Sequence, residues 1–213
     1  LIWRGSIIYL RNMVGLSQIV IFSLLINYTG NFKEGDWVNF VNFRYVTSVA
    51  IDQDNVYFGT TGGVLRYDRF FNKWLDPMTI TDGLPDSQID NIAYDPSNDQ
   101  LWVSTPSGNA YYQPTCQKWY SGGEFPANLA RNDFRASVFT ILNTEFGYIY
   151  QGGIITDPLM QQYQMTKGVA DGFDHLYVGT WGMGPAMINT RYDDLTLLPY
   201  GIHDNNTSTV IRI

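Results

Sequence analysis

A seven-residue phrase occurs three times in the chain and constrains the fold more than any other feature. It reads "DNVYFGT" at 54–60, "DQLWVST" at 99–105 and "DHLYVGT" at 174–180. Each copy runs Asp, any residue, apolar, aromatic, apolar, Gly or Ser, Thr. A short phrase that recurs after tens of residues is typical of folds built from stacked copies of one supersecondary unit.

The first two copies are separated by a fixed interval. Thr60 and Thr105 are 45 residues apart, and so are Trp74 and Trp119, which follow the phrase in each copy. A period of about 40–50 residues suits a four-stranded blade of a β-propeller. The third copy departs from this period, because Thr180 lies 75 residues after Thr105.

Each copy also has the pattern of a set of short strands. The segment "VTSVAID" at 46–52 alternates apolar with small or polar residues, whereas the phrase itself is an apolar run, as expected of a strand covered on both faces. Gly62–Gly63 in the first copy and Pro106–Ser107–Gly108 in the second then reverse the chain into a third strand. Trp74 and Trp119 begin a fourth, so each copy predicts an antiparallel meander of four strands.

The composition favours an all-β fold. The chain has seventeen Asp, three Glu and 20 Gly, and 15% of its residues are aromatic. Asp favours turns and caps, aromatic residues favour strands, and Glu, which favours helix interiors, is scarce. The hydrophobic content of 45% is enough for a buried core. The net charge of −7 argues against nucleic acid as a partner, because phosphate binding needs clustered Lys and Arg.

We therefore expect an incomplete β-propeller in residues 31–213. Blades are expected at about 45–80, 88–121 and 164–200, with an insert at about 122–163 and the start of a further blade at 207–213. The insert contains "FGYIYQGGIITDPLMQQY", which predicts a hairpin turning at Gly152–Gly153, either an inserted hairpin or a degenerate half-blade. Three units and a beginning do not close a ring of about four to eight blades, so we interpret the sequence as a fragment.

Residues 1–30 have the features of a signal peptide or an N-terminal anchor. The apolar stretch "VGLSQIVIFSLLI" at 14–26 follows Arg4 and Arg11. It is shorter than the ~20 residues of a membrane-spanning helix and within the ~7–15 of a signal-peptide core. No small-x-small cleavage site follows it, and an uncleaved amphipathic anchor and a buried first strand are the alternatives. We expect an exported protein, periplasmic or extracellular, with membrane attachment through this segment or through a missing C-terminal region.

The repeat resembles that of the two-component-regulator propeller family. That repeat joins a Gly-Leu-Pro turn and a first strand to a second strand of the form Leu-Trp-aliphatic-Gly-Thr, followed by a Gly-rich link. The fullest match is "TDGLPDSQIDNIAYDPSNDQLWVSTPSG" at 81–108, and 45–68 and 168–184 are further copies. Ser104 replaces the usual Gly in the second copy. The resemblance implies a bacterial, extracytoplasmic input domain that binds or senses a ligand in signal transduction and has no catalytic activity of its own.

Functions of other classes stay open. One is a fragment of a propeller enzyme, such as a lyase or a glycan hydrolase, and another is a secreted scaffold that binds only protein. The sequence has no Gly-rich phosphate loop, no nucleophile elbow and no His-Glu-x-x-His motif. Cys116 is the single cysteine, so a Cys-based metal site is excluded, and we predict no cofactor. The ligand stays open among a small molecule, a glycan and a protein.

Two residue types recur at fixed places in the repeat, and we predict that they build turns. An Asp ends a strand before a turn residue, where its side chain commonly caps the backbone: Asp52, Asp95 and Asp171. A Thr closes each copy of the phrase: Thr60, Thr105 and Thr180. No repeated base accompanies these Thr residues, so we expect them to donate hydrogen bonds and not to act as nucleophiles.

A ligand site is expected in the loops at one end of the propeller. The links between second and third strands, and one link between blades, supply the candidate residues: Thr61, Ser107, Trp181, Met183 and His203. Trp181 is the most suggestive, because an exposed Trp beside Gly182 is a common anchor for sugars or peptides. The alternative, which we favour, is that this Trp packs between adjacent blades.

Overall fold

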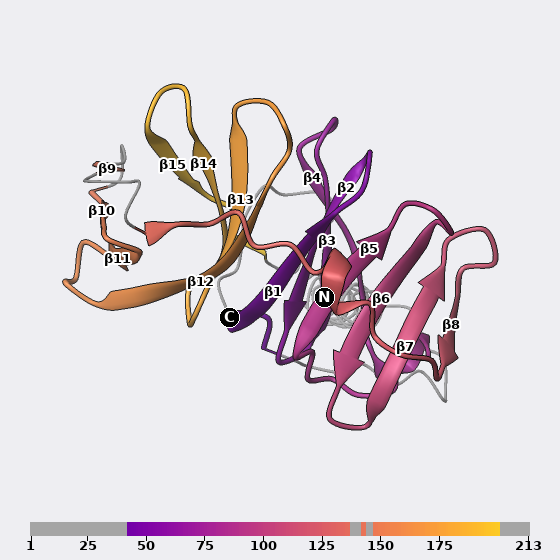
Figure 1. The fold of residues 1–213 in the computed structure, drawn as a ribbon. Coiled ribbons are helices and arrows are strands. Elements are labelled where there is room, and N and C mark those ends of the chain that lie inside the picture. Colours follow the sequence, from indigo (N-terminus) through magenta and orange to yellow (C-terminus); the bar gives the residue numbers. More distant parts are fainter. Residues whose placement is uncertain (1–41, 137–141, 144–146, 201–213) are drawn as a thin grey trace, which may run out of the picture. The chain divides into compact units, whose positions relative to one another are not determined.

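The computed structural model describes residues 42–136, 142–143 and 147–200, which lie in one compact unit, Asn39–Ile213. This part of the chain is all-β and its strands form antiparallel sheets, which confirms the predicted fold class (Figure 1). Its helical elements include two short 3-10 helices, η1 (Ile80–Asp82) and η2 (Ala127–Leu129). The predicted signal peptide or anchor and the predicted start of a further blade lie outside the described residues.

The first two sheets are four-stranded meanders whose strand order follows the chain. Sheet A contains β1 (Val46–Ile51), β2 (Asn55–Thr60), β3 (Gly63–Asp68) and β4 (Lys73–Met78). Sheet B contains β5 (Asn91–Asp95), β6 (Gln100–Thr105), β7 (Gly108–Gln113) and β8 (Lys118–Ser121). The link between β2 and β3 is Thr61–Gly62, one residue earlier than predicted, because Gly63 already pairs with Thr60. Gly63 has φ of 127°, a value that favours glycine.

Sheet C has seven strands, in the order β15-β14-β13-β12-β11-β10-β9. They are β9 (Leu142–Asn143), β10 (Ile149–Gln151), β11 (Ile154–Thr156), β12 (Gln162–Ala170), β13 (His175–Thr180), β14 (Gly184–Asn189) and β15 (Asp194–Leu197). The first part of β12 pairs with β11 and the second part with β13. The hairpin β10–β11 turns at Gly152–Gly153 as predicted, and it extends the third sheet instead of standing apart from it.

The sheets pack in the order C, A, B, which differs from their order in the chain (Figure 1). Sheet A lies between the other two, because β1 contacts both β12 of sheet C and β5 of sheet B. In this order, we call the face of a sheet that is turned toward the start of the order its leading face and the opposite face its trailing face. Sheet A therefore has sheet C on its leading face and sheet B on its trailing face. The same side chains of the repeat fall on the same face in each sheet, because the strand registers match.

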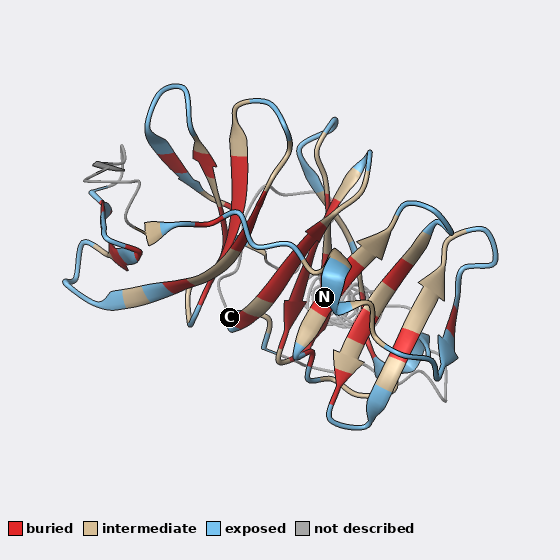
Figure 2. Cartoon of the chain, in the orientation of Figure 1, coloured by how far each residue is buried: buried red, intermediate tan, exposed pale blue. Residues whose placement is uncertain are grey.

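The contact between sheets C and A is apolar. Val169 and Tyr177 on the trailing face of C pack on Val56, Phe58 and Leu65 on the leading face of A. Figure 2 shows buried segments in the strands of both sheets. Tyr177 is 2% exposed, and the three side chains of sheet A are fully buried. Burial of this much apolar surface is the main stabilising contribution that one sheet makes to the next.

The contact between sheets A and B repeats this arrangement. Ala50 and Tyr57 on the trailing face of A cluster with Leu101, Val103 and Ala110 on the leading face of B. Tyr57 occupies the repeat position of Tyr177 and is 5% exposed. The aromatic residue of the phrase is therefore an inter-sheet packing residue in both copies.

The leading face of sheet C is covered by the insert and not by another sheet. Leu176 and Ile188 on this face cluster with Tyr150 and Ile155 from the β10–β11 hairpin. The insert thus occupies the place that a preceding sheet occupies on A and on B.

The links that leave the fourth strands also connect neighbouring sheets. Leu84, after β4, is buried in the cluster that contains Trp119 of sheet B. Leu198, after β15, is buried in the cluster of sheet A, and Trp74 donates a hydrogen bond from Nε1 to the carbonyl oxygen of Pro199 (2.9 Å). Both links carry a Leu-Pro pair, so the same sequence feature joins C to A and A to B.

The Gly of the phrase lies where the next sheet approaches closely, at the first strand β1 or just before the first strand β5. A Cβ atom at Gly59 would lie 2.7 Å from Cγ2 of Ile89, and one at Gly179 would lie 2.4 Å from Cγ1 of Val46. Ser104 takes this position in sheet B, whose trailing face has no apolar cluster with another sheet within the described residues, although Lys167 of β12 donates to the side chain of Asn91 there (2.6 Å). The replacement of Gly by Ser in the second copy therefore has a structural explanation.

The repeated Thr and Asp residues build turns, as predicted. Each Thr hydroxyl donates to the carbonyl of the Gly that begins the third strand: Thr60 to Gly63 (2.8 Å), Thr105 to Gly108 (2.6 Å) and Thr180 to Gly184 (2.6 Å). Each Asp accepts a hydrogen bond from the backbone N–H two residues ahead: Asp52 from Asp54 (2.7 Å), Asp95 from Ser97 (2.9 Å) and Asp171 from Phe173 (2.8 Å). These contacts are architectural.

Candidate functional site

Two of the residues predicted to bind ligand are brought together in the structure. The backbone N–H of Thr61 donates to the carbonyl oxygen of Tyr45 (3.2 Å), and Tyr45 forms an isolated antiparallel bridge with Trp181. Met183, two residues further, lines a cavity of about 80 Å³ beside Tyr163. This volume is too small for most organic ligands.

The other two predicted residues are not part of this group. Ser107 is exposed and donates a hydrogen bond from Oγ to the carboxylate of Asp86 (2.7 Å), which lies in the link before β5. His203 lies outside the described residues. The predicted site therefore stays a prediction, with Thr61 and Trp181 as its neighbouring members.

The structure shows how Trp181 packs, whereas its role as a ligand anchor stays a prediction. Its ring centroid lies 5.0 Å from that of Tyr45, the residue that precedes β1, so the indole does pack against a neighbouring segment. The residue nevertheless keeps 50% of its surface exposed. Trp181 thus makes a packing contact and keeps part of its surface accessible.

A larger hollow, of about 710 Å³, lies at the opposite ends of the strands. We call it the turn-end hollow, because the turns that join first to second strands in all three sheets contribute to it. Six of its lining residues carry charge or an exposed ring: Asp52, Arg69, Phe70, Arg131, Asp171 and Phe173. No sequence pattern points to a ligand site at this end, although Asp52 and Asp171 are predicted as repeated turn residues.

The carboxylate of Asp52 is engaged by its own turn. It accepts hydrogen bonds from the backbone N–H of Asn55 (2.5 Å) and from the hydroxyl of Tyr57 (2.6 Å). Burial raises the pKa of Tyr57 far above its ordinary value, and the charge of Asp52 raises it further. Asp52 is therefore a rigid part of the floor of the hollow.

Asp171 is held in the same way in sheet C. It accepts hydrogen bonds from the backbone N–H of Phe173 (2.8 Å) and of His175 (3.2 Å), and its second oxygen lies 3.1 Å from Nδ1 of His175. Burial acts to raise the pKa of Asp171, but these hydrogen bonds outweigh burial and hold the pKa below its ordinary value of 3.8.

Asp171→Asn is expected to remove an acid-sensitive part of the stability. The depressed pKa means that ionised Asp171 stabilises the fold above pH 3.8 and that this contribution is lost as the pH falls through the folded-state pKa. We expect the variant to be about 1–2 kcal/mol less stable than wild type at pH 7 and indistinguishable from it near pH 2, measured by urea unfolding. Asp174→Asn, at an exposed residue, is the control and should change stability by less than about 0.5 kcal/mol at either pH. An equal deficit for Asp171→Asn at both pH values would contradict this role.

Two guanidinium groups and two exposed rings complete the turn-end hollow. Arg131 binds Asp133 and the carbonyl oxygen of Ala170, whereas Arg69 forms no ion pair with any described residue. Phe70 and Phe173 are 67% and 82% exposed. Large apolar side chains with this exposure are costly to solvate, and they are common where a ligand is bound.

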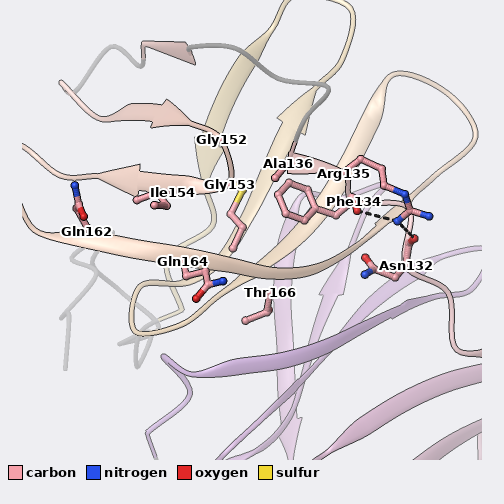
Figure 3. A pocket seen from close by; sticks show the side chains of 11 residues that line it. Asn132, Phe134, Arg135, Ala136, Gly152, Gly153, Ile154, Gln162, Gln164 and Thr166 are labelled. Atoms are coloured by element: carbon pink, nitrogen blue, oxygen red, sulfur yellow. Dashed lines mark hydrogen bonds between the residues drawn. The ribbon is translucent and has the colours of Figure 1, made fainter.

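A second hollow, of about 780 Å³, lies beside β12 in sheet C (Figure 3). Gln162, Gln164 and Thr166 alternate along β12, and Phe134 and Arg135 lie across from them (Figure 3). This hollow is rich in hydrogen-bonding groups. Its rim ends at Ala136, which precedes residues outside the described ranges, so the turn-end hollow is the better-defined candidate.

Neither a metal centre nor a membrane-spanning helix is found in the part of the chain that the structure describes. No three His, Cys, Asp or Glu side chains are grouped there in a way that could hold a metal ion. No helix there has the length and apolar character needed to cross a bilayer.

The repeated four-stranded sheets define the chain as a protein of the β-propeller type. No protein-family model matches it, and neither does any curated protein. Similar solved structures include the extracellular domains of BT4673 and BT3049 from B. thetaiotaomicron, both described as hybrid two component systems. The match to BT4673 has a TM-score of 0.35 at 15% identity and covers 74% of this chain and 24% of that one. The match to BT3049 has a TM-score of 0.33 at 14% identity and covers 73% and 25%.

A third similar structure is PorZ, a surface component of the type-IX secretion system of Porphyromonas gingivalis. The TM-score is 0.31 at 12% identity, and the match covers 78% of this chain and 35% of PorZ. This chain thus spans about a quarter to a third of the length of these proteins. Likeness at these TM-scores supports no argument about the activity of this chain.

Proposed function

We propose that the chain is part of a ligand-binding, sensing module that works outside the cytoplasm and has no catalytic activity of its own. The repeat sequence supports this proposal, because it resembles that of two-component-regulator propellers. The turn-end hollow is the observation that carries it: three sheets contribute to one hollow with two exposed aromatic rings and the guanidinium group of Arg69, which forms no ion pair with a described residue and lies 5.9 Å from the ring centroid of Phe70.

The side chains of the turn-end hollow suit binding better than acid–base chemistry. Asp52 and Asp171 are occupied by hydrogen bonds from their own turns, which fixes their positions. A general acid needs a carboxyl group that stays protonated near neutral pH, and the lowered pKa of Asp171 is the opposite of that. Rigid turns that present fixed polar groups reduce the ordering cost of binding.

The chemistry of the turn-end hollow limits the kind of ligand. Arg69 offers donors to a carboxylate or to another acceptor group, and Phe70 and Phe173 offer apolar surface. The two Asp carboxylates balance the two guanidinium groups, so the hollow favours a polar ligand of low net charge. We infer a small molecule or a glycan or peptide end with an acceptor group beside an apolar face.

Thermal unfolding with a panel of soluble sugars, small carboxylates and tripeptides tests this function. A ligand present at about one hundred times its Kd is expected to add about 2.7 kcal/mol to the free energy of unfolding. Phe173→Ser and Arg69→Gln should abolish that gain without changing the stability of the free protein. Tyr192→Ser and Arg191→Gln change exposed residues outside the hollow and are the matched controls. A panel without any stabilising member, or a gain that survives both hollow variants, would reject the proposal.

A further inference from the structure

The second hollow, beside β12, differs in its chemistry from the turn-end hollow, and we call it the β12 hollow. Among the described residues that line it, Arg135 alone carries a charge, and none of them has a carboxylate. Arg135 is exposed and forms no ion pair with any described residue. In a chain with a net charge of −7, a guanidinium group in a lining without carboxylates attracts anionic groups to this place.

The guanidinium group of Arg135 is positioned by its own segment. Its Nη1 donates to the carbonyl oxygens of Asn132 (2.8 Å) and Phe134 (3.0 Å) (Figure 3). The segment is fixed to β12, because Asp133 donates from its backbone N–H to the carbonyl oxygen of Gly168 (2.8 Å), and Oδ1 of Asn132 accepts from the backbone N–H of Gly168 (3.2 Å). The donors on Nε and Nη2 of Arg135 have no acceptor among the described residues. These two groups form the fork that binds a carboxylate with two parallel hydrogen bonds.

The β12 hollow also presents carboxamide groups at a regular spacing. In Figure 3, Gln162, Gln164 and Thr166 follow one another along β12, and Arg135 lies beyond Thr166. Gln162 and Gln164 are exposed, and their side chains form no hydrogen bond with a described residue. Two residues of a strand span about 6.6 Å, which is also the two-residue repeat of an extended peptide. Each carboxamide has donors and an acceptor, so the pair matches the backbone of a peptide at every second residue.

The shape of the β12 hollow favours an extended peptide over other ligands. The polar row on β12 alone is roughly 13 Å long, whereas a tripeptide spans only about 10 Å and does not reach from this row to Arg135. Phe134 is 8% exposed, so the aromatic ring in the lining offers no face on which a sugar could stack. A single guanidinium group is too little for nucleic acid. Ile154, which pairs with Gln164 and is 39% exposed, offers apolar surface to a peptide side chain.

We propose that the β12 hollow binds an extended peptide segment of about five or more residues, with a carboxylate at Arg135 and its backbone amides at Gln162 and Gln164. The carboxylate belongs to the C-terminus of the peptide or to an acidic side chain, and both present the same two acceptor oxygens. The β12 hollow and the turn-end hollow share no lining residue, so this site is additional to the proposed sensing function and does not depend on it.

An anisotropy screen of random hexapeptides that carry an N-terminal fluorophore and no acidic residue tests this site. Each sequence is made in three forms: with a free C-terminal carboxylate, with a C-terminal amide, and as the amide with Asp as its last residue. A form with a carboxylate should bind at least about ten times more tightly than the neutral amide. The form that shows this gain identifies the source of the carboxylate.

Variants of the lining assign the two ends of the peptide. Arg135→Gln should reduce the affinity for the carboxylate forms to that for the neutral amide. The double variant Gln162→Ala and Gln164→Ala should weaken the binding of every form. Arg191→Gln and Gln88→Ala change exposed residues outside the β12 hollow, and these matched controls should bind like wild type.

Two comparisons keep the test decisive. Arg135→Gln removes two hydrogen bonds within its segment, whereas the double glutamine variant removes none, so the pair separates loss of the contact from loss of the fold. Phe173→Ser changes the turn-end hollow and should bind the peptides like wild type. Four results would overturn the proposal: a library without any binder, equal binding of neutral and carboxylate forms, binding that survives both variants of the β12 hollow, or binding that is lost in Phe173→Ser.

Discussion

Gly179→Ala is expected to destabilise the protein by about 2–3 kcal/mol. The added methyl group would lie 2.4 Å from Cγ1 and 2.8 Å from Cβ of Val46 and 2.9 Å from Oγ1 of Thr166. Val46 is fully buried between sheets C and A, so the methyl group fits only if the two sheets separate. Urea unfolding followed by circular dichroism measures the loss as a lower midpoint with an unchanged slope.

The control for this prediction is the same position in sheet B. Ser104→Ala removes one oxygen from a half-buried residue and adds no volume, so it should alter the free energy of unfolding by less than about 0.5 kcal/mol. If Gly179→Ala were as mild as Ser104→Ala, sheet A would not pack closely on sheet C, and the order C, A, B would be wrong.

Thr180→Val is expected to cost about 2 kcal/mol at nearly unchanged volume. The Thr180 hydroxyl is completely buried; it donates to the carbonyl oxygen of Gly184 (2.6 Å) and accepts from the backbone N–H of Met183 (3.2 Å). Valine fills the space but leaves both backbone groups without this partner, and an unsatisfied buried group carries the full cost of its desolvation.

Thr190→Val provides the comparison. Thr190 also donates from its hydroxyl to a backbone carbonyl, that of Asp174 (3.1 Å), but its site is exposed and water can replace the bond. Its loss should cost less than about 0.5 kcal/mol. Equal costs for the two substitutions would mean that the last residue of the phrase does not hold the link between the second and third strands.

The blades are predictable from sequence because their determinants are local. Alternating apolar residues define the first strand, the apolar run defines the second, and Asp52 or Thr60 defines the turn at either end through hydrogen bonds to residues two or three positions away. Such contacts need no knowledge of the remainder of the chain. The same locality places the hairpin turn at Gly152–Gly153.

The order of the sheets is not predictable in this way. It depends on contacts between distant residues, such as that of Trp74 with Pro199, which are 125 positions apart in the chain. The sequence does carry one usable signal, the Leu-Pro pair after β4 and after β15. Only the structure shows that each pair packs on the Trp-bearing strand of a neighbouring sheet.

The turn-end hollow was missed for a related reason. Phe70 and Phe173 are ordinary turn residues in the sequence, and their exposure follows from the packing of three sheets. Trp181 was singled out because a Trp beside glycine is conspicuous, yet half of its surface is taken up by local contacts, the ring of Tyr45 among them. A ligand site differs from an ordinary turn because its side chains are exposed and come together from several sheets. Both properties arise only when the sheets have packed.

Amide hydrogen exchange in the presence and absence of a stabilising ligand from the panel tests the proposed function most directly. The account predicts that the ligand slows exchange in the turns that line the turn-end hollow, at 52–54 and 171–173. It predicts no change in the links at the opposite end, at 61–62 and 181–183. Slowed exchange at Thr61 and Trp181 with unchanged exchange at Asp171–Phe173 would contradict it and would move the site to the end that the sequence alone predicted.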